Sequence, residues 1–155
     1  MKNYYLCVRI RVPSGESEKS PSVTIARLNW FPYFTHKSVI IWLSRWFTFC
    51  IGKYNLSTVV THKTSDWSVI ELDEPVEYIW IKAVRRLDAV EIFYSFDDKD
   101  YIMMRNCWLQ DNTPVMVGMM AASPDGSGFK VKFDNFRITH LPDQRRCEWL
   151  KNNQE

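Results

Sequence analysis

Aromatic side chains that stand close to carboxylate or guanidinium groups are the residues of this chain best suited to chemistry. The face of a tryptophan can stack on the apolar C–H side of a pyranose, while neighbouring charged groups bond the sugar hydroxyls. Trp80 and Glu91 offer this combination, and Asp66 with Trp67 offers it a second time. Arg105 adds a nearby cation. These five residues are the candidate ligand-binding residues of the chain.

Each candidate also has a structural interpretation. Trp80 alternates away from Ile79 and Ile81 in a predicted strand, so its face is either an exposed platform or core, and core packing is favoured. Glu91 falls on the same side of the next strand, where the two side chains can be neighbours. Asp66 and Trp67 follow a polar stretch and could stand at the rim of a cleft.

Pairing with an arginine is the more ordinary explanation for Glu91. Arg85, Arg86 and Arg105 all lie on strands expected near it, and a cross-strand ion pair would engage its carboxylate. Glycoside hydrolysis would need a second carboxylate on the face of Glu91, and the sequence offers none. We therefore assign no catalytic residue and expect a protein that is not an enzyme.

Other kinds of site have little support. The sequence between positions 97 and 100 is Asp-Asp-Lys-Asp, which predicts a hairpin turn rather than an acidic site. His36, His62 and His140 are far apart, so no metal site is expected. The glycines form no phosphate-binding loop, and no G-x-S-x-G nucleophile motif occurs. No cofactor is expected.

Composition limits the class of protein. The 155 residues are enough for one domain with a sizeable core, and 46% of them are hydrophobic, which excludes a disordered chain. Lysine and arginine number 20 against 18 acidic residues, so the net charge of +2 favours neither nucleic acid nor an anionic membrane as partner. The four cysteines form no C-x-x-C pair and the N-terminus has no signal-peptide pattern. Both features predict buried thiols and a cytoplasmic protein.

The elements that must position the candidate residues are predicted to be strands. Apolar alternation with period two, broken by turn residues, recurs along the second half of the chain and favours an antiparallel sandwich. The run at 115–122 is nearly all apolar, which suits a central strand buried on both faces. The expected strands span residues 4–12, 54–61, 66–72, 78–86, 89–96, 101–108, 115–122 and 129–138, with poorer patterns at 23–31 and 39–51.

Several phrases in this region occur together in one known family. They are Thr-His-Lys-Thr-Ser-Asp-Trp-Ser-Val from position 61, Arg-Arg-Leu-Asp-Ala-Val-Glu from 85, Tyr-Ser-Phe-Asp from 94 and Ser-Pro-Asp-Gly-Ser-Gly-Phe from 123. Over about residues 52–138 the chain resembles a family of unknown function that includes the yeast regulation-of-enolase protein. The resemblance implies a concanavalin A-like β-sandwich (a jelly roll), incomplete or irregular in its N-terminal part.

The same resemblance sets the expected organisation and role. Residues 1–51 lack the family pattern, and either weak packing or a shifted reading frame would explain this; 52–140 form the sandwich and 141–155 a polar tail. The family implies a non-catalytic regulatory or interaction protein of the regulation-of-enolase type, linked to sugar metabolism. The fold suggests, by analogy, a carbohydrate-binding lectin-like module instead. The expected partner is therefore a carbohydrate or a glycolytic-pathway protein; the oligomeric state is not indicated.

Overall fold

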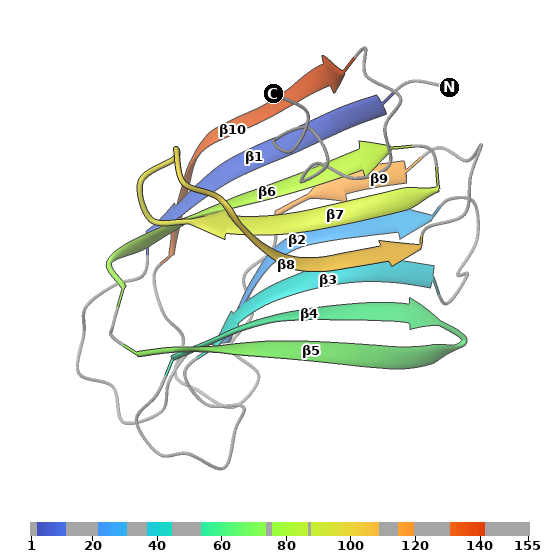
Figure 1. Ribbon diagram of the computed structural model, residues 1–155, viewed down its shortest axis with the longest axis horizontal. Helices are drawn as coiled ribbons and strands as arrows, with labels where there is room; N and C mark the ends of the chain where they lie inside the picture. Colours follow the sequence, from blue (N-terminus) through green and yellow to red (C-terminus); the bar gives the residue numbers. More distant parts are fainter. Residues whose placement is uncertain are drawn as a thin grey trace, which may run out of the picture. The chain divides into compact units, whose positions relative to one another are not determined.

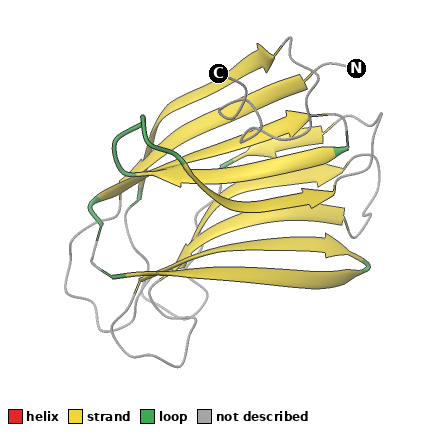
Figure 2. Ribbon diagram, in the orientation of Figure 1, coloured by secondary structure: helices red, strands yellow, loops and turns green. Residues whose placement is uncertain are grey.

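The computed structural model of the chain describes residues 3–11, 22–30, 37–44, 54–73, 76–86, 88–108, 115–119 and 131–141. Every regular element in these ranges is a β-strand (Figures 1 and 2), which confirms the predicted all-β class. None of the described segments is a helix that could cross a membrane. The strands are β1 (Asn3–Arg11), β2 (Ser22–Trp30), β3 (Lys37–Ser44), β4 (Tyr54–His62), β5 (Thr64–Leu72), β6 (Tyr78–Arg86), β7 (Ala89–Ser95), β8 (Ile102–Trp108), β9 (Val115–Gly118) and β10 (Lys132–Leu141).

The strands form two five-stranded sheets, and the chain divides into two compact units. One sheet has the order β10-β1-β6-β7-β8, and most of it belongs to the unit made of residues 1–9, 79–113 and 133–155. The other sheet has the order β5-β4-β3-β2-β9 within residues 10–78 and 114–132. Strands from both ends of the chain thus meet in the first sheet, since β10 is hydrogen-bonded to β1.

Antiparallel hairpins supply the local order of both sheets. In the second sheet β4 pairs with β5 from Tyr54 opposite Leu72 to His62 opposite Thr64. Lys63 makes the tight connection with a φ of 66°, in the left-handed region that such turns need. In the first sheet β6 pairs with β7 and β7 with β8, the latter with a register shift between Ile92 and Phe93. This shift is a β-bulge, which increases local twist.

The first sheet has one apolar face. Successive side chains of a strand point to opposite faces, so every second residue of β1, β6 and β7 shares a side. The side chains on this apolar face are almost all buried because they are aliphatic, aromatic or thiol groups with nothing to gain from water. They include Leu6, Val8, Ile10, Ile79, Ile81, Ala83, Val90, Ile92, Tyr94 and Cys107.

The opposite side of the first sheet, which we call the polar face, carries aromatic and charged residues. Period two places Tyr5, Cys7 and Arg9 of β1 there, and the even-numbered residues of β6 from Trp80 onward. On β7 the register adds three partners: Ser95 opposite Trp80, Phe93 opposite Lys82, and Glu91 opposite Val84. Much of this face is buried as well, since the side chains on it that have little exposure include Cys7, Trp80, Val84, Glu91, Phe93 and Ser95.

The run at 115–122 is not a central strand: β9 covers only Val115–Gly118 and lies at the end of its sheet, beside β2. Gly118 and Met119 are exposed, so apolar composition alone misjudged its position. Within residues 1–51, β1 packs well, since Leu6, Cys7, Val8 and Ile10 are buried. The other predictions for residues 1–51, and those for residues 142–155, fall on side chains or residues outside the described part of the chain.

Candidate functional site

The polar face carries a pocket of about 210 Å³. Strands β1, β6 and β10 and the turn between β7 and β8 all contribute to it, and all of its lining residues belong to the same compact unit. Two phenols, two cations and one carboxylate supply its polar surface, and two aliphatic side chains supply the rest. The lining residues are Tyr5, Lys82, Val84, Asp98, Tyr101, Arg137 and Leu141.

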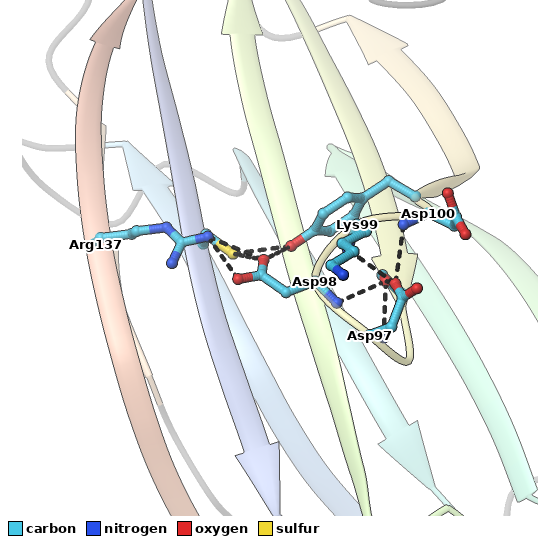
Figure 3. A network of polar contacts seen from close by, with 8 residues as sticks. Asp97, Asp98, Lys99, Asp100 and Arg137 are labelled. Carbon is cyan, nitrogen blue, oxygen red and sulfur yellow. Dashed lines mark hydrogen bonds and ion pairs between the residues drawn. The ribbon is translucent and has the colours of Figure 1, made fainter.

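The turn after β7 is built by short polar bonds around Asp97. Its Oδ1 accepts hydrogen bonds from the backbone N–H groups of Lys99 (2.8 Å) and Asp100 (2.9 Å) and from the hydroxyl of Ser95 (2.8 Å). The backbone N–H groups donating to this carboxylate lower the pKa of Asp97 to about 2. Asp98 then adopts a φ of 64°, which an aspartate tolerates better than most residues. The predicted turn at 97–100 is thus present, and Figure 3 shows its bonds.

Asp98 differs from Asp97 because its carboxylate belongs to the polar face. It accepts the hydrogen bond of the Tyr101 hydroxyl, and it accepts bonds of 2.9 and 3.1 Å from Nη2 of Arg137. In Figure 3 the side chain of Arg137 extends from β10 toward this carboxylate. Since the Tyr101 proton is committed to Asp98, the Cys7 thiol can donate either to the Tyr101 hydroxyl, 3.2 Å away, or to Oδ1 of Asp98, 3.9 Å away. The result is a relay of thiol, phenol and carboxylate.

The relay has a definite protonation state. Burial, together with the hydrogen bond to Asp98, raises the pKa of Tyr101, so the phenol stays protonated and donates. Burial likewise raises the pKa of the Cys7 thiol. The hydrogen bond to Asp98 raises the pKa of Arg137, which keeps the guanidinium charged. The neutral thiol and phenol therefore add no charge to the pocket.

Cations lie against aromatic rings on both sides of this relay. Nζ of Lys82 lies 4.0 Å from the ring centroid of Tyr101 and 4.9 Å from that of Phe93. The guanidinium carbons of Arg9 and Arg137 each lie 5.5 Å from the ring centroid of Trp80. These are cation–π distances, and they orient the cations without neutralising them.

A local irregularity of β10 brings its charged residues to one side. Arg9 of β1 donates to the carboxylate of Asp134 from Nε (2.6 Å) and Nη2 (2.9 Å), while Arg137 reaches Asp98. Strict alternation would put Asp134 and Arg137, three positions apart, on opposite faces. Asn135 between them has a φ of 52°, and this left-handed residue interrupts the alternation. Both side chains can then contact groups of the polar face.

The pocket offers hydrogen-bond donors and acceptors to a ligand. Nε and Nη1 of Arg137 make no hydrogen bond to the described part of the chain, and the side chain is 45% exposed. The hydroxyl of Tyr5 likewise bonds to no described residue. Asp98 is the one carboxylate of the lining, and Arg137 and Tyr101 already engage it. Such an arrangement suits binding of a polyhydroxylated molecule better than glycoside hydrolysis, which needs two placed carboxylates.

Trp80 and Glu91 share the polar face as predicted, but they are not neighbours. Trp80 lies opposite Ser95 and Glu91 opposite Val84, with the Lys82–Phe93 pair between them. Trp80 is only 7% exposed, so it is packed rather than presented as a platform. Glu91 is fully buried beside Arg86, with Nε and Oε2 3.8 Å apart. The ordinary explanation for Glu91, an arginine partner, is the one observed.

The remaining candidates lie elsewhere. Asp66 and Trp67 are exposed on β5 of the second sheet. In the register of the β4–β5 hairpin, Asp66 lies opposite Val60 and Trp67 lies opposite Val59. Arg105 on β8 lies opposite Ile92, whereas the residue opposite Glu91 is Asn106. Adjacent positions of a strand point to opposite faces, so Arg105 is on the other side of the sheet from Glu91. Within the unit that holds the pocket, the structure therefore does not bring Trp80, Glu91 and Arg105 together.

The pocket residues were not identified from the sequence, although two signals existed. Lys82 falls two positions from Trp80 on the same predicted strand, so period two already placed it on the same face. Tyr5 and Cys7 alternate in the same way on β1. No local signal marked Asp98 as different from Asp97, because both belong to one turn. Within the described ranges, no group of three or more His, Cys, Asp or Glu residues could hold a metal ion.

Comparison with known proteins places the chain in a family. Residues 38–141 match the family described as protein of unknown function (DUF1349), so the match begins before residue 52. Regulation of enolase protein 1 of Saccharomyces cerevisiae is 28% identical over 98 residues, which cover 63% of this chain and 50% of that protein. The chain thus spans about half the length of this curated relative. The predicted family resemblance is confirmed.

Solved structures show the same fold. A functionally unknown protein from Saccharomyces cerevisiae aligns with a TM-score of 0.71 at 22% identity, covering 90% of this chain and 70% of that one. A variant of the GH43 protein BlXynB from Bacillus licheniformis gives 0.65 at 17% identity (90% and 28% covered). The CBM2 module of the evolved Dit protein of Lactobacillus casei BL23 phage J-1 gives 0.59 at 10% (89% and 60% covered). The predicted antiparallel concanavalin A-like β-sandwich is confirmed.

Proposed function

The chain belongs to the family of unknown function described above, and from that premise we propose that it is a non-catalytic protein that binds a carbohydrate. The binding site in this proposal is the pocket on the polar face of the sheet β10-β1-β6-β7-β8. We place the ligand against the residues that line the pocket, and not against Trp80 and Glu91 as the sequence had suggested. The proposal keeps the carbohydrate class that the fold suggested.

The composition of the pocket is the observation that carries this proposal. In sugar-binding sites, aromatic rings stack on the apolar face of the sugar, and charged side chains form hydrogen bonds with its hydroxyl groups. Here the phenols of Tyr5 and Tyr101 stand with the carboxylate of Asp98 and the donors of Arg137. The volume of about 210 Å³ is below the ~300–1,000 Å³ usual for drug-sized ligands, which limits the pocket to a small ligand.

Preorganisation supports the same interpretation. The relay through Cys7, Tyr101 and Asp98 fixes the carboxylate before any ligand arrives, and Arg137 is held against it. Side chains that are already ordered lose less entropy on binding. The likeness to a CBM2 module and to a GH43 protein supports a carbohydrate role by analogy of fold.

A sugar titration with matched variants tests the proposal. Tryptophan fluorescence or calorimetry would follow binding of a panel of monosaccharides to the wild-type chain and to Arg137→Ala. We expect at least one sugar to bind and Arg137→Ala to weaken it about tenfold or more, equivalent to ~1.4 kcal/mol. Arg11→Ala removes an exposed arginine that does not line the pocket, and should leave binding unchanged. The absence of binding to every sugar in the panel would overturn the proposal.

Regulation of a metabolic enzyme is a second candidate function, favoured by the similarity to regulation of enolase protein 1. In this proposal the chain acts in the cytoplasm on a glycolytic-pathway protein, with no nucleic acid, membrane or cofactor involved. Enolase activity measured with and without the purified chain tests it directly. A change in the activity together with no response to any sugar would favour regulation over carbohydrate binding, and the opposite pair of results would favour the first proposal.

A further inference from the structure

We propose that two copies of this chain join edge to edge through β10, so that the sheet β10-β1-β6-β7-β8 of one copy continues into that of the other. The two β10 strands run antiparallel and are related by two-fold symmetry, with Ile138 of each copy on the symmetry axis. The edge of the sheet makes this contact, so the proposal does not depend on what the pocket binds.

The position of β10 leaves one of its edges open. It is the last strand at one side of its sheet, as Figure 1 shows, and β1 is its one neighbour among the described strands. A strand in this position presents a row of backbone N–H and C=O groups that can pair with another chain. Proteins usually block such an edge with lysine, proline, a bulge or a very short strand.

The part of β10 from Phe136 to Leu141 has none of these protections. Its sequence is Phe-Arg-Ile-Thr-His-Leu, which contains neither lysine nor proline and is rich in residues that favour strands. The left-handed residue Asn135 comes before this stretch, and no residue from Phe136 to Leu141 has a positive φ. The other edge strand of the sheet, β8, differs because a register shift interrupts its pairing with β7. The unprotected edge is therefore that of β10.

Exposed apolar side chains lie along the same stretch. Phe136 is 40% exposed and Ile138 is 54% exposed, although both are large hydrophobic residues. Arg137 between them points to the polar face, where it bonds to Asp98. Phe136 and Ile138 therefore share the opposite face of the strand. Pairing with another strand would bury this apolar surface together with the backbone groups of the edge.

The side chains of β10 match a second copy of themselves in one register. A two-fold axis that is perpendicular to the sheet and passes through a residue keeps the same face of both copies on the same side. With the axis at Ile138, this residue meets its own copy and Phe136 lies opposite His140. Arg137 then lies opposite Thr139, which carries no charge. The polar faces form one continuous surface, so the two pockets open on the same side of the joined sheet.

Neighbouring registers fit less well. An axis at Arg137 would set two guanidinium groups directly opposite each other, and like charges in that position destabilise a sheet. An axis at Phe136 would carry the pairing across Asn135, whose left-handed conformation interrupts the strand. An axis at Thr139 would leave Phe136 opposite a residue beyond the end of β10. The register centred on Ile138 avoids all three conflicts.

Sedimentation velocity of the full chain from about 1 to about 300 μM measures the self-association. We expect a monomer–dimer equilibrium in the micromolar range, since an edge contact buries less surface than a standard interface. Ile138→Lys should raise the dissociation constant about tenfold or more, because it removes the apolar contact and sets two ammonium groups across the axis. Ile102→Lys on β8 is the matched control. Ile102 is 53% exposed at the other edge of the same sheet, so the change should leave the dimer intact.

A charge-swap experiment locates the axis. Ile138→Glu should weaken self-association as Ile138→Lys does, whereas an equimolar mixture of the two variants should form a heterodimer, because opposite charges then meet at the axis. Circular dichroism checks that both variants are folded. If either unfolds, hydrogen exchange of the wild-type chain still tests the surface. Amides between Phe136 and Leu141 should gain protection as the concentration rises, and those of β8 should not.

Each failure has its own meaning. A wild-type chain that stays monomeric at the highest concentration would overturn the proposal. A dimer that survives both Ile138 variants would overturn it as well, because another surface would then make the contact. If both variants and their mixture are monomeric, Ile138 does not lie on the axis and the proposed pairing is wrong. None of these results bears on carbohydrate binding, which the titration of the wild-type chain and Arg137→Ala tests separately.

Discussion

The guanidinium group of Arg137 on β10 donates two hydrogen bonds to the carboxylate of Asp98 in the turn between β7 and β8. Strands β1 and β6 lie between β10 and β7 in the sheet, so about 14 Å of sheet separates the two strands at ~4.8 Å a step. The long side chain of Arg137 covers this separation, since it extends from β10 toward Asp98 (Figure 3). Both residues of this contact line the pocket.

Asp98→Asn should weaken sugar binding and leave the stability of the fold nearly unchanged. The side chains of Arg137 and Asp98 are 45% and 26% exposed, so their ion pair contributes only about 0–1 kcal/mol to the free energy of unfolding. Asparagine also tolerates the left-handed φ of 64°. We expect a nearly unchanged denaturant midpoint but sugar affinity lowered about tenfold or more. Asp100→Asn, in the same turn and outside the lining, is the control and should retain affinity.

Trp80→Ala should act mainly on stability. Trp80 is 7% exposed and has the guanidinium groups of Arg9 and Arg137 against its ring, so truncation would leave a cavity beneath them. Loss of a buried tryptophan side chain costs about 3–5 kcal/mol of unfolding free energy. Trp108→Ala is the matched control, because Trp108 is 53% exposed, and it should cost about 1 kcal/mol or less. Equal losses from the two variants in urea unfolding would contradict the packed role of Trp80.

The sequence predicted strands better than it predicted the site. Period-two alternation and turn residues located β6 at residues 78–86 without error and most other strands to within a few positions. The same alternation correctly put Trp80 and Glu91 on one face. It did not make them neighbours: with Arg86 opposite Ala89, the register of the hairpin puts Glu91 opposite Val84, four positions along β6 from Trp80.

The pocket could not be predicted because it depends on contacts between distant segments. Cys7, Tyr101 and Arg137 come from three separate parts of the chain, and only the strand order brings them together. The orientation of Arg137 depends further on the left-handed conformation of Asn135, which period-two reasoning does not anticipate. The edge position of β9 was missed for a similar reason, since apolar composition reports burial but not the place of a strand in its sheet.

The turn around Asp97 should weaken in acid over a defined range. The pKa of Asp97 is lowered from 3.8 to about 2 by the hydrogen bonds that its carboxylate accepts from the backbone N–H groups of Lys99 and Asp100. A lowered pKa in the folded state means that the carboxylate stabilises the turn above pH 3.8, and that this contribution disappears as pH falls toward about 2. The melting temperatures of the wild-type chain and Asp97→Ala should therefore converge over this range. A side-chain carboxyl NMR titration midpoint near 3.8 for Asp97 would contradict the bonding described.

The buried pair of Arg86 and Glu91 gives the last prediction. Both side chains are 0% exposed, and their Nε and Oε2 atoms are 3.8 Å apart. Glu91→Gln would leave the buried guanidinium without its compensating charge, so we expect a loss of about 3–5 kcal/mol in unfolding free energy. Arg86→Met alone should cost a similar amount, because it strands the carboxylate instead. The double variant should lose clearly less than the sum of the two, since neither charge is then left buried alone. A double-mutant cycle in urea measures this coupling, and additive losses would show that the two groups are held independently by other neighbours.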